Sequence, residues 1–233
     1  VHVFSNACEI ERIDAIAKQN NLKVIYDAAH SFNVKYKGAS ILNYGDISAI
    51  SFHATKVFHS IEGGALIINN DELVEKARYL INFGIKNTEE IPELGTNAKM
   101  NEFEAAMGLC VLNDIQELNK KRKKIYYLYL QELEKYVTLQ KMNSHSVQNH
   151  SYFPIILKNT KQLKRVEDGL KKENIYARRY FYPSLDTLKY INPKQYCKIS
   201  RDISSKILCL PMYPELETIN VKKICKIIKN NLC

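Results

Sequence analysis

The sequence lacks the features that mark membrane and secreted proteins. No stretch approaches the roughly 20 consecutive apolar residues that a membrane-spanning helix needs. The first residues, Val1–Phe4, carry neither a basic region nor an apolar signal core. A composition of 45% hydrophobic and 25% charged residues is typical of a soluble globular protein. We therefore expect a cytoplasmic protein without a membrane partner. Because the sequence does not begin with Met, we also expect it to be processed, trimmed or incomplete.

The sequence also lacks any CxxC pair. Its six cysteines are scattered, the first at Cys8 and the last at Cys233. Disulfide frameworks and zinc sites need closely spaced or regularly repeated cysteines. We therefore predict reduced thiols, and we expect no metal site.

Acidic residues are outnumbered by basic ones, and the formal net charge is +9. The densest basic run spans residues 120–124 inside a long helical pattern. Such a run can indicate a nucleic-acid partner, but no DNA- or RNA-binding motif accompanies it. We interpret the run as a solvated helix face and expect no nucleic acid as a partner. A positive excess would also suit an anionic substrate or cofactor.

Residues 1–136 alternate helical patterns with short apolar runs, which indicates an α/β architecture with a largely parallel sheet. Two of the expected strands end close to polar, chemically versatile residues. The expected strands are 22–27, 46–52 and 65–68, and the expected helices are 9–20, 71–83 and 101–136. The last of these is long for a globular helix, so we expect a break or bend near Gly108 or in the basic run.

Residues 137–233 show a different order of elements. Strand patterns at 152–157 and 207–210 are accompanied by helical patterns at 160–173 and from Asn220 onward. This order predicts a smaller α+β domain beginning at residue 137. The polar stretch 141–150 is expected to connect the domains or to form an exposed turn.

Two residues at predicted strand ends carry the main chemical signal. Asp27, in YDAAH, ends one strand, and Lys56, in SFHATK, follows the next strand by a few residues. Open α/β sheets place their ligand sites at the carboxyl ends of strands. A lysine and a carboxylate in one crevice suit pyridoxal 5′-phosphate (PLP) chemistry. The lysine forms a Schiff base with the cofactor aldehyde, and the carboxylate keeps the pyridine nitrogen protonated. The hydroxyl of Ser51 could bind the cofactor phosphate.

Several blocks of the sequence resemble the DegT/StrS family of sugar aminotransferases, in order and in spacing. The blocks are YDAAHSF, SFHATKVFHSIEGGALI, GTNAKMNEFEAAMGL, YARRYFYPSL and LCLPMYP. The resemblance implies a fold-type I PLP-dependent transferase: part of a large domain with a mainly parallel sheet, then a small C-terminal domain. It also implies PLP as cofactor, a nucleotide-linked keto-sugar as substrate, and a homodimer with a shared active site.

Carried over residue by residue, the resemblance makes Lys56 the Schiff-base lysine and Asp27 the partner of the pyridinium nitrogen. It places His30 near the ring hydroxyl of the cofactor, where the family has Gln or His; a packing role or a helix-start role is the alternative. The remaining cofactor-binding residues that it implies are Ala29, Ser51, Asn97 and Lys99. The last two match a loop that reaches the cofactor phosphate of the neighbouring subunit, and their alternative is an ordinary loop before a helix.

The resemblance implies a substrate-binding role for three further residues. His53 is expected either to pack or to touch substrate, while Arg178 and Tyr182 match a region near the sugar-binding side. Lone arginines are usually surface residues, which is the competing interpretation for Arg178.

The function implied by the resemblance is transfer of an amino group, from glutamate, to a dTDP-linked keto-6-deoxyhexose. We expect C4 to be favoured over C3 and the product to serve aminodeoxysugar and surface polysaccharide biosynthesis. Family members carry an N-terminal portion, with a phosphate-binding turn, that is not found here. We therefore expect this polypeptide alone to be a poor catalyst unless another chain supplies that portion. The alternative is a catalytically inactive remnant or an assembly subunit.

Overall fold

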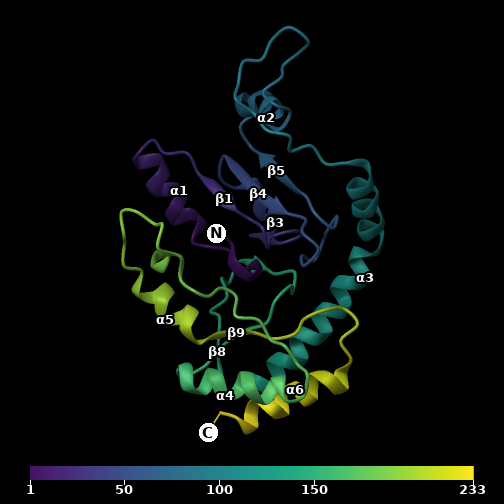
Figure 1. The fold of residues 1–233 in the computed structure, drawn as a ribbon, viewed down its shortest axis with the longest axis vertical. Helices are drawn as coiled ribbons and strands as arrows, with labels where there is room; N and C mark the ends of the chain where they lie inside the picture. The colour runs from purple at the N-terminus through teal and green to yellow at the C-terminus, as the bar shows by residue number, and fades with distance from the viewer. Residues whose placement is uncertain (233) are drawn as a thin grey trace. The chain divides into compact units, whose positions relative to one another are not determined.

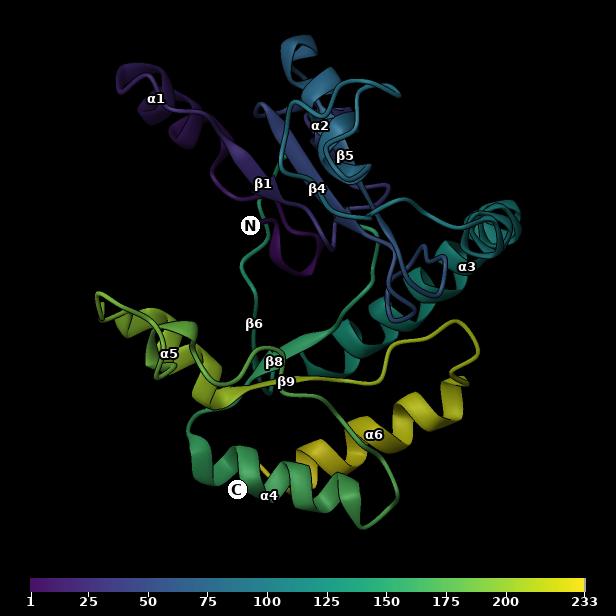
Figure 2. The same cartoon turned by 45° about the horizontal axis from the view of Figure 1, so that its top comes forward.

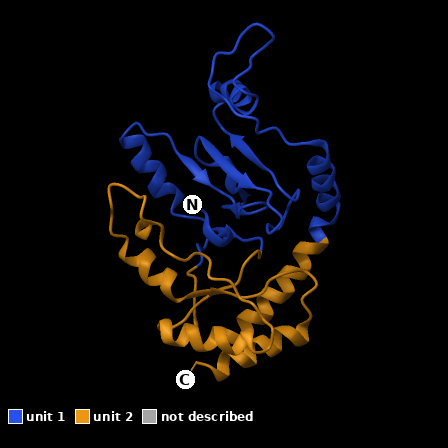
Figure 3. Cartoon of the chain, viewed as in Figure 1, with its two compact units in different colours: residues 1–116, 142–149 blue, residues 117–141, 150–233 orange. Residues whose placement is uncertain are grey.

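The computed structural model describes residues 1–232, which divide into two compact units (Figure 3). Unit 1 consists of Val1–Gln116 and Met142–Asn149, and unit 2 consists of Glu117–Lys141 and the chain from His150 onward. The division falls inside the long helix α3 (Glu102–Leu133), which contributes residues to both units. The sequence pattern predicts a domain boundary at residue 137, and that boundary stays a prediction.

Unit 1 contains a three-stranded sheet with the order β1-β4-β5 (Figure 1). Helix α1 (Ile10–Gln19) leads into β1 (Ile25–Asp27), which pairs in parallel with β4 (Ile47–Ser51). Strand β5 (Gly64–Ile68) pairs with β4 in the antiparallel direction. A parallel connection needs a long crossover, usually a helix, and the loop between β4 and β5 contains none. The sheet of this chain is therefore mixed, where sequence analysis predicts a largely parallel one.

A second, smaller sheet in unit 1 joins segments far apart in the sequence. Its order is β3-β2-β7, from β2 (Lys35–Tyr36), β3 (Ala39–Ser40) and β7 (Ser146–Val147). Strand β7 lies in the polar stretch that sequence analysis expects to be a connection or an exposed turn. Its two residues pair with β2 by backbone hydrogen bonds, which do not depend on side-chain polarity. Two 3-10 turns also belong to unit 1, η1 (Val3–Ser5) and η2 (Ile41–Asn43).

The segment after β5 forms a 3-10 turn and a helix, η3 (Asp71–Leu73) and α2 (Val74–Ile81). The predicted helix 71–83 is thus shorter at its C-terminal end. Gly84 adopts a φ of 81°, which favours glycine, and its N–H donates to the Tyr79 carbonyl at 2.7 Å. This bond closes the last turn and directs the chain away from the helix axis.

Helix α3 is continuous from Glu102 to Leu133, so a break near Gly108 or in the basic run does not occur, and the alternative of a bend there stays a prediction. A glycine costs a helix only about 1 kcal/mol, and α3 is anchored by the fully buried Tyr129 and Leu133. Within the basic run, the four lysines are exposed, as a solvated face requires. Arg122 is the exception, because it is partly buried and its Nη1 donates to the Met212 carbonyl at 2.8 Å.

Unit 2 contains an antiparallel sheet with the order β6-β8-β9 and the helices α4 to α6 (Figure 2). The strands are β6 (Thr138–Leu139), β8 (Pro154–Ile156) and β9 (Ile207–Cys209). The helices are α4 (Thr160–Lys171), α5 (Lys198–Lys206) and α6 (Thr218–Asn230), and the turn η4 (Leu185–Thr187) precedes α5. Helices α4 and α6 pack through apolar stripes with helical spacing, formed by Leu163, Val166, Leu170, Val221, Ile224 and Ile228.

The start of α4 offers a direct test of local stability. The Asn159 side chain is the N-cap, and it accepts a hydrogen bond from the Gln162 N–H at 2.9 Å. We expect Asn159→Ala to lower the free energy of unfolding by about 1 kcal/mol, because an N–H of the first turn then loses its partner. Urea denaturation measures the change. Asn159→Asp keeps the acceptor and is the control, so an equal loss in both variants would contradict the capping role.

Among the described residues, no helix combines the length and the apolar character that crossing a membrane requires.

Candidate active site

The carboxyl ends of β1 and β4 bring two polar side chains to one edge of the unit 1 sheet. Asp27 is the last residue of β1, and Ser51 is the last residue of β4. The two strands are parallel, with Asp27 in register with Ala49, so both ends point the same way. One carboxylate oxygen of Asp27 accepts the N–H of Ala29 at 3.0 Å, which turns the chain sharply after the strand.

Lys56 lies in the loop between β4 and β5, and backbone hydrogen bonds close this loop tightly. The Lys56 N–H donates to the His53 carbonyl at 2.9 Å, and the Phe52 N–H donates to the Gly63 carbonyl at 2.9 Å. Gly63 has a φ of 136°, and a Cβ there would come within 2.7 Å of the Ser60 hydroxyl. Only glycine fits this position, so the Glu-Gly-Gly motif is what allows the lysine loop to return into β5.

Three phenylalanines connect the loop after β1 to the lysine loop. The rings of Phe32 and Phe58 are stacked with centroids 4.4 Å apart, and Phe52 meets Phe58 edge to face at 4.8 Å. Such ring pairs are worth about 0.5–1.5 kcal/mol beyond the area that they bury. Because the rings come from both loops, their packing fixes the Asp27 segment against the Lys56 segment.

The surroundings of Lys56 lower the pKa of its amine. Its side chain is half-buried, and loss of hydration lowers the pKa of the amine, while the Asp27 carboxylate acts in the opposite direction. Among the described residues, no salt bridge to the Lys56 ammonium forms. The amine therefore loses its proton more readily than that of a solvated lysine, as a nucleophilic lysine requires.

His30 is buried beside the same two charged groups. The pKa of His30 is lowered to about 4, mainly by burial and in part by the Lys56 charge, while the Asp27 charge acts in the opposite direction. The Nδ1 atom accepts the backbone N–H of Phe4 at 3.1 Å, and the two rings are stacked. His30 is thus a neutral, hydrogen-bonding group at pH 7, and its sequence-predicted place near the cofactor ring stays a prediction.

Ser51 and His53 are linked by the turn that follows β4. The Ser51 hydroxyl accepts the His53 N–H at 3.3 Å. The His53 ring is exposed, its Nδ1 lies 2.8 Å from the Thr55 hydroxyl, and its Nε2 lies 3.7 Å from a Glu62 carboxylate oxygen. The two roles expected for His53, packing or touching substrate, stay predictions.

Asn97 and Lys99 lie against the end of α2. Asn97 forms an isolated β-bridge with Asn82, and the Lys99 ammonium donates to the Asn82 side-chain oxygen at 2.9 Å. The same ammonium lies 4.4 Å from the centroid of the Phe83 ring. Both side chains are exposed, and their predicted reach to a neighbouring subunit stays a prediction.

Arg178 and Tyr182 belong to unit 2. The Arg178 guanidinium donates to the Tyr180 hydroxyl at 3.1 Å, and its backbone pairs with Cys209. The exposed Tyr182 ring stacks with Arg179, whose guanidinium carbon lies 3.8 Å from the ring centroid. The two predicted residues therefore have separate partners within unit 2, and their substrate-binding role stays a prediction.

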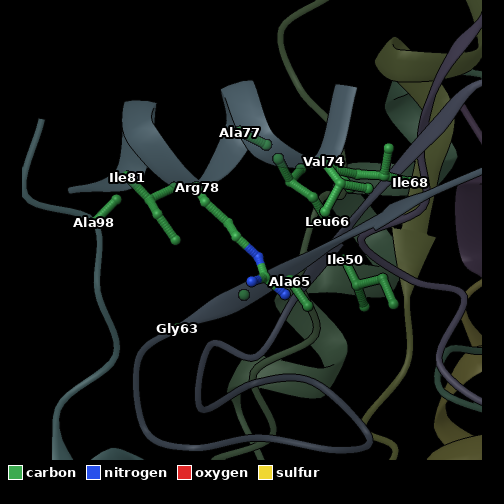
Figure 4. Close-up of a pocket in the computed structure, with 12 residues that line it drawn as sticks. Ile50, Gly63, Ala65, Leu66, Ile68, Val74, Ala77, Arg78, Ile81 and Ala98 are labelled. Atoms are coloured by element: carbon green, nitrogen blue, oxygen red, sulfur yellow. The ribbon is translucent and has the colours of Figure 1, made fainter. Parts of the chain in front are cut away.

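A cavity of about 780 Å³ lies elsewhere in unit 1, between the sheet and α2. Aliphatic side chains of β4, β5 and α2 line it, with Arg78 as the charged residue (Figure 4). Figure 4 shows the Arg78 guanidinium extended toward Ala65. Lys56, Asp27 and Ser51 are not part of this lining. The candidate catalytic residues are therefore at the strand ends and do not line this apolar cavity.

Comparison with known proteins identifies the family. The sequence pattern of the DegT/DnrJ/EryC1/StrS aminotransferase family matches residues 1–229. The chain belongs to this family. The DegT/StrS resemblance seen in the sequence is thereby confirmed, and PLP is the cofactor on which aminotransferases of this family depend.

Two curated relatives of the family are bacterial sugar transaminases. The chain is 42% identical over 225 residues to a dTDP-4-amino-4,6-dideoxy-D-glucose transaminase of Shigella dysenteriae, covering 94% of this chain and 61% of the relative. It is 35% identical over 240 residues to a transaminase of the same description from Escherichia coli, covering 98% of this chain and 64% of the relative. The chain thus spans less than two thirds of the length of either family member.

The fold agrees with this membership. The solved structure of DesI with its TDP-sugar product superimposes with a TM-score of 0.91 at 26% identity, covering 99% of this chain and 61% of that one. The predicted fold-type I architecture is confirmed. Sequence reasoning missed the partners of the site residues: the phenylalanine cluster, the Phe4 amide, and the Asn149 side chain, which donates to the His30 carbonyl at 3.0 Å. The Phe4 and Asn149 contacts span long sequence separations, so no local pattern marks them.

Proposed function

We propose that the chain carries the catalytic-lysine region of a PLP-dependent aminotransferase acting on a nucleotide-linked keto-sugar. The observation that carries the proposal is the arrangement of the strand ends: Asp27 ends β1, Lys56 follows the parallel strand β4, and packed phenylalanine rings join the two loops. A half-buried lysine with a lowered pKa, beside a carboxylate and a neutral imidazole, is the set of groups that a pyridoxal aldehyde and ring require.

The residues present fit this cofactor. Lys56 would hold it through the side-chain amine, Asp27 would keep a proton on the pyridine nitrogen, and His30 would donate to the ring oxygen. When bound, PLP supplies an electron sink for charge that develops on the amino-bearing carbon. The freed Lys56 amine would then move a proton between the substrate and the cofactor, which its lowered pKa favours. The Ser51 hydroxyl and the Ala29 backbone would contribute further polar contacts, with Ser51 toward the phosphate.

The proposed substrate is a dTDP-linked keto-6-deoxyhexose, aminated at C4 in preference to C3, with glutamate as donor. The names of the Shigella and Escherichia relatives, both 4-amino-4,6-dideoxyglucose transaminases, support the C4 preference. We propose a role in aminodeoxysugar and surface polysaccharide synthesis in the cytoplasm, and a homodimer in which Asn97 and Lys99 reach the partner's cofactor phosphate. His53, Arg178 and Tyr182 are the proposed contacts to the sugar nucleotide.

Covalent trapping tests the proposal. The chain is incubated with PLP, reduced with borohydride and mapped by peptide mass spectrometry. We expect the cofactor on Lys56, because this amine is the one whose pKa is lowered beside a carboxylate. Lys56→Ala should lose the label, and Lys35→Ala, at an exposed lysine of β2, should keep it.

The labelling result has two outcomes, and each leads to a different conclusion. Label on Lys56 justifies assays with dTDP-keto-sugars and glutamate, in which C4 and C3 products are separated by NMR. A folded chain that takes no label at Lys56 would overturn the proposal for this polypeptide and favour an inactive remnant or an assembly subunit.

A further inference from the structure

The ring of His30 is bound by a backbone group from the beginning of the chain. The Phe4 N–H donates to the Nδ1 atom at 3.1 Å, across 26 residues of sequence. Phe4 has a φ of 55° and a ψ of 36°, a left-handed conformation that is rare for an aromatic residue. The Phe4 side chain is buried, so packing holds this conformation and directs its amide at the imidazole.

This hydrogen bond determines where the imidazole proton lies. A ring nitrogen that accepts an N–H bond carries no proton itself, so the neutral ring must carry its proton on the other nitrogen. Burial and the neighbouring Lys56 charge keep the ring neutral at pH 7, with the Asp27 charge opposing them. In the neutral ring, Nε2 is therefore the donor.

A second group holds the backbone of the same segment. The Asn149 side-chain amide donates to the His30 carbonyl at 3.0 Å and to the Phe32 carbonyl at 2.8 Å. Asn149 is only 5% exposed and lies more than 110 residues away in sequence. Both bonds come from one NH₂ group, so this side chain bridges the turn that carries the histidine. The amide and the Phe4 N–H thus restrain the main chain and the ring of His30 independently.

We propose that the Phe4 amide and Asn149 are positioning groups that hold His30 in its Nε2–H tautomer, as a fixed hydrogen-bond donor toward the ring oxygen of the cofactor. The inference rests on the proposed function only for the identity of the acceptor. A donor that is already oriented loses little entropy when the acceptor arrives, and it favours the anionic form of that oxygen. A histidine that could switch tautomers would present an acceptor for part of the time and repel the same oxygen.

The tautomer can be measured without any cofactor. In the ¹⁵N-histidine-labelled chain, two-bond proton–nitrogen NMR correlations distinguish Nε2–H from Nδ1–H. We expect His30 to show the Nε2–H form alone between pH 5.5 and 8. An Nδ1–H ring, or a mixture of the two forms, would overturn the proposal. Because PLP is absent, this failure is distinguishable from failure of the proposed function, which the borohydride experiment reports.

Matched substitutions at His30 test the donor role. The glutamine of His30→Gln can accept the Phe4 N–H through its oxygen and donate through its NH₂ group, whereas the glutamate of His30→Glu can only accept. We expect His30→Gln to keep the PLP dissociation constant within about threefold and His30→Glu to weaken binding about 10- to 100-fold, the range for losing a hydrogen bond to a charged group. Equal affinities in the two variants would refute the donor role.

Asn149→Asp tests the second anchor. The aspartate has nearly the same shape but no N–H, so both carbonyls lose their donor. We expect a second His30 tautomer to appear in the NMR spectrum, while Asn43→Asp, at an exposed residue of the same unit, leaves the spectrum unchanged. A His30 spectrum that is identical in Asn149→Asp and the unsubstituted chain would remove Asn149 from the proposal.

Discussion

Asp27→Asn is expected to lower the pKa of Lys56 further and, under the proposed function, to lower turnover by about 100-fold. The Asp27 charge raises the Lys56 pKa against the effect of burial, so its removal leaves desolvation unopposed. The same carboxylate is proposed to hold the proton on the pyridine nitrogen, and an opposite charge at close range shifts such a pKa by about 1–3 units. A shift of about two units corresponds to the 100-fold loss.

The substitution removes the charge of Asp27 and should leave the local backbone structure intact. Asparagine keeps an oxygen that can accept the Ala29 N–H, so the turn after β1 should persist. The pKa of Lys56 can be read from the pH dependence of its labelling by an amine-reactive reagent, with peptide mapping, even in a chain that has no turnover. Asp71→Asn, at an exposed acidic residue, is the control. An unchanged Lys56 pKa in Asp27→Asn would contradict the coupling on which the candidate site depends.

Acidification is expected to destabilise unit 1 strongly between pH 7 and pH 4. Burial lowers the pKa of both His2 and His30 to about 4 in the folded chain, against 6.5 for the unfolded reference. The unfolded state therefore binds protons more tightly over this window, and the free energy of unfolding falls as pH falls. A shift of this size corresponds to about 3 kcal/mol for each histidine. Urea denaturation at several pH values measures the loss.

Variants assign this loss to the two side chains. His2→Gln and His30→Gln each remove one titrating ring but keep a side-chain oxygen for the N–H groups of Cys8 and Phe4. Each should flatten the pH profile, and the double variant should flatten it most. His145→Gln, at an exposed histidine of unit 1, should not. A profile equally steep in the double variant would show that other groups control acid unfolding.

Helices and strands with strong patterns were accessible to sequence analysis, whereas short and non-local elements were not. The apolar periodicity of α1, α4 and α6 and the β-rich run of β4 depend on neighbours a few residues away, so a local window detects them. Strand β7 has no such signature. Strand β7 consists of two residues paired across more than a hundred positions, and only the finished fold brings its partner β2 beside it.

For the side chains, too, local features could be predicted from the sequence and long-range contacts could not. Lys56 and Asp27 are marked by motif and by their positions at strand ends, because strand direction alone places both at one edge of a sheet. Arg122 shows the opposite case, since a basic run predicts solvated side chains and yet one of them bonds to a distant carbonyl.

The family, the chemical groups at the strand ends and the cofactor class could be predicted before folding, because they depend on residue identity and short-range order. The protonation and tautomeric states of those groups depend on the folded chain. The lowered pKa of Lys56 arises from burial, and the tautomer of His30 arises from the Phe4 amide. Both effects depend on atoms brought together across long sequence separations, and desolvation and hydrogen-bond geometry exist only once the chain has packed.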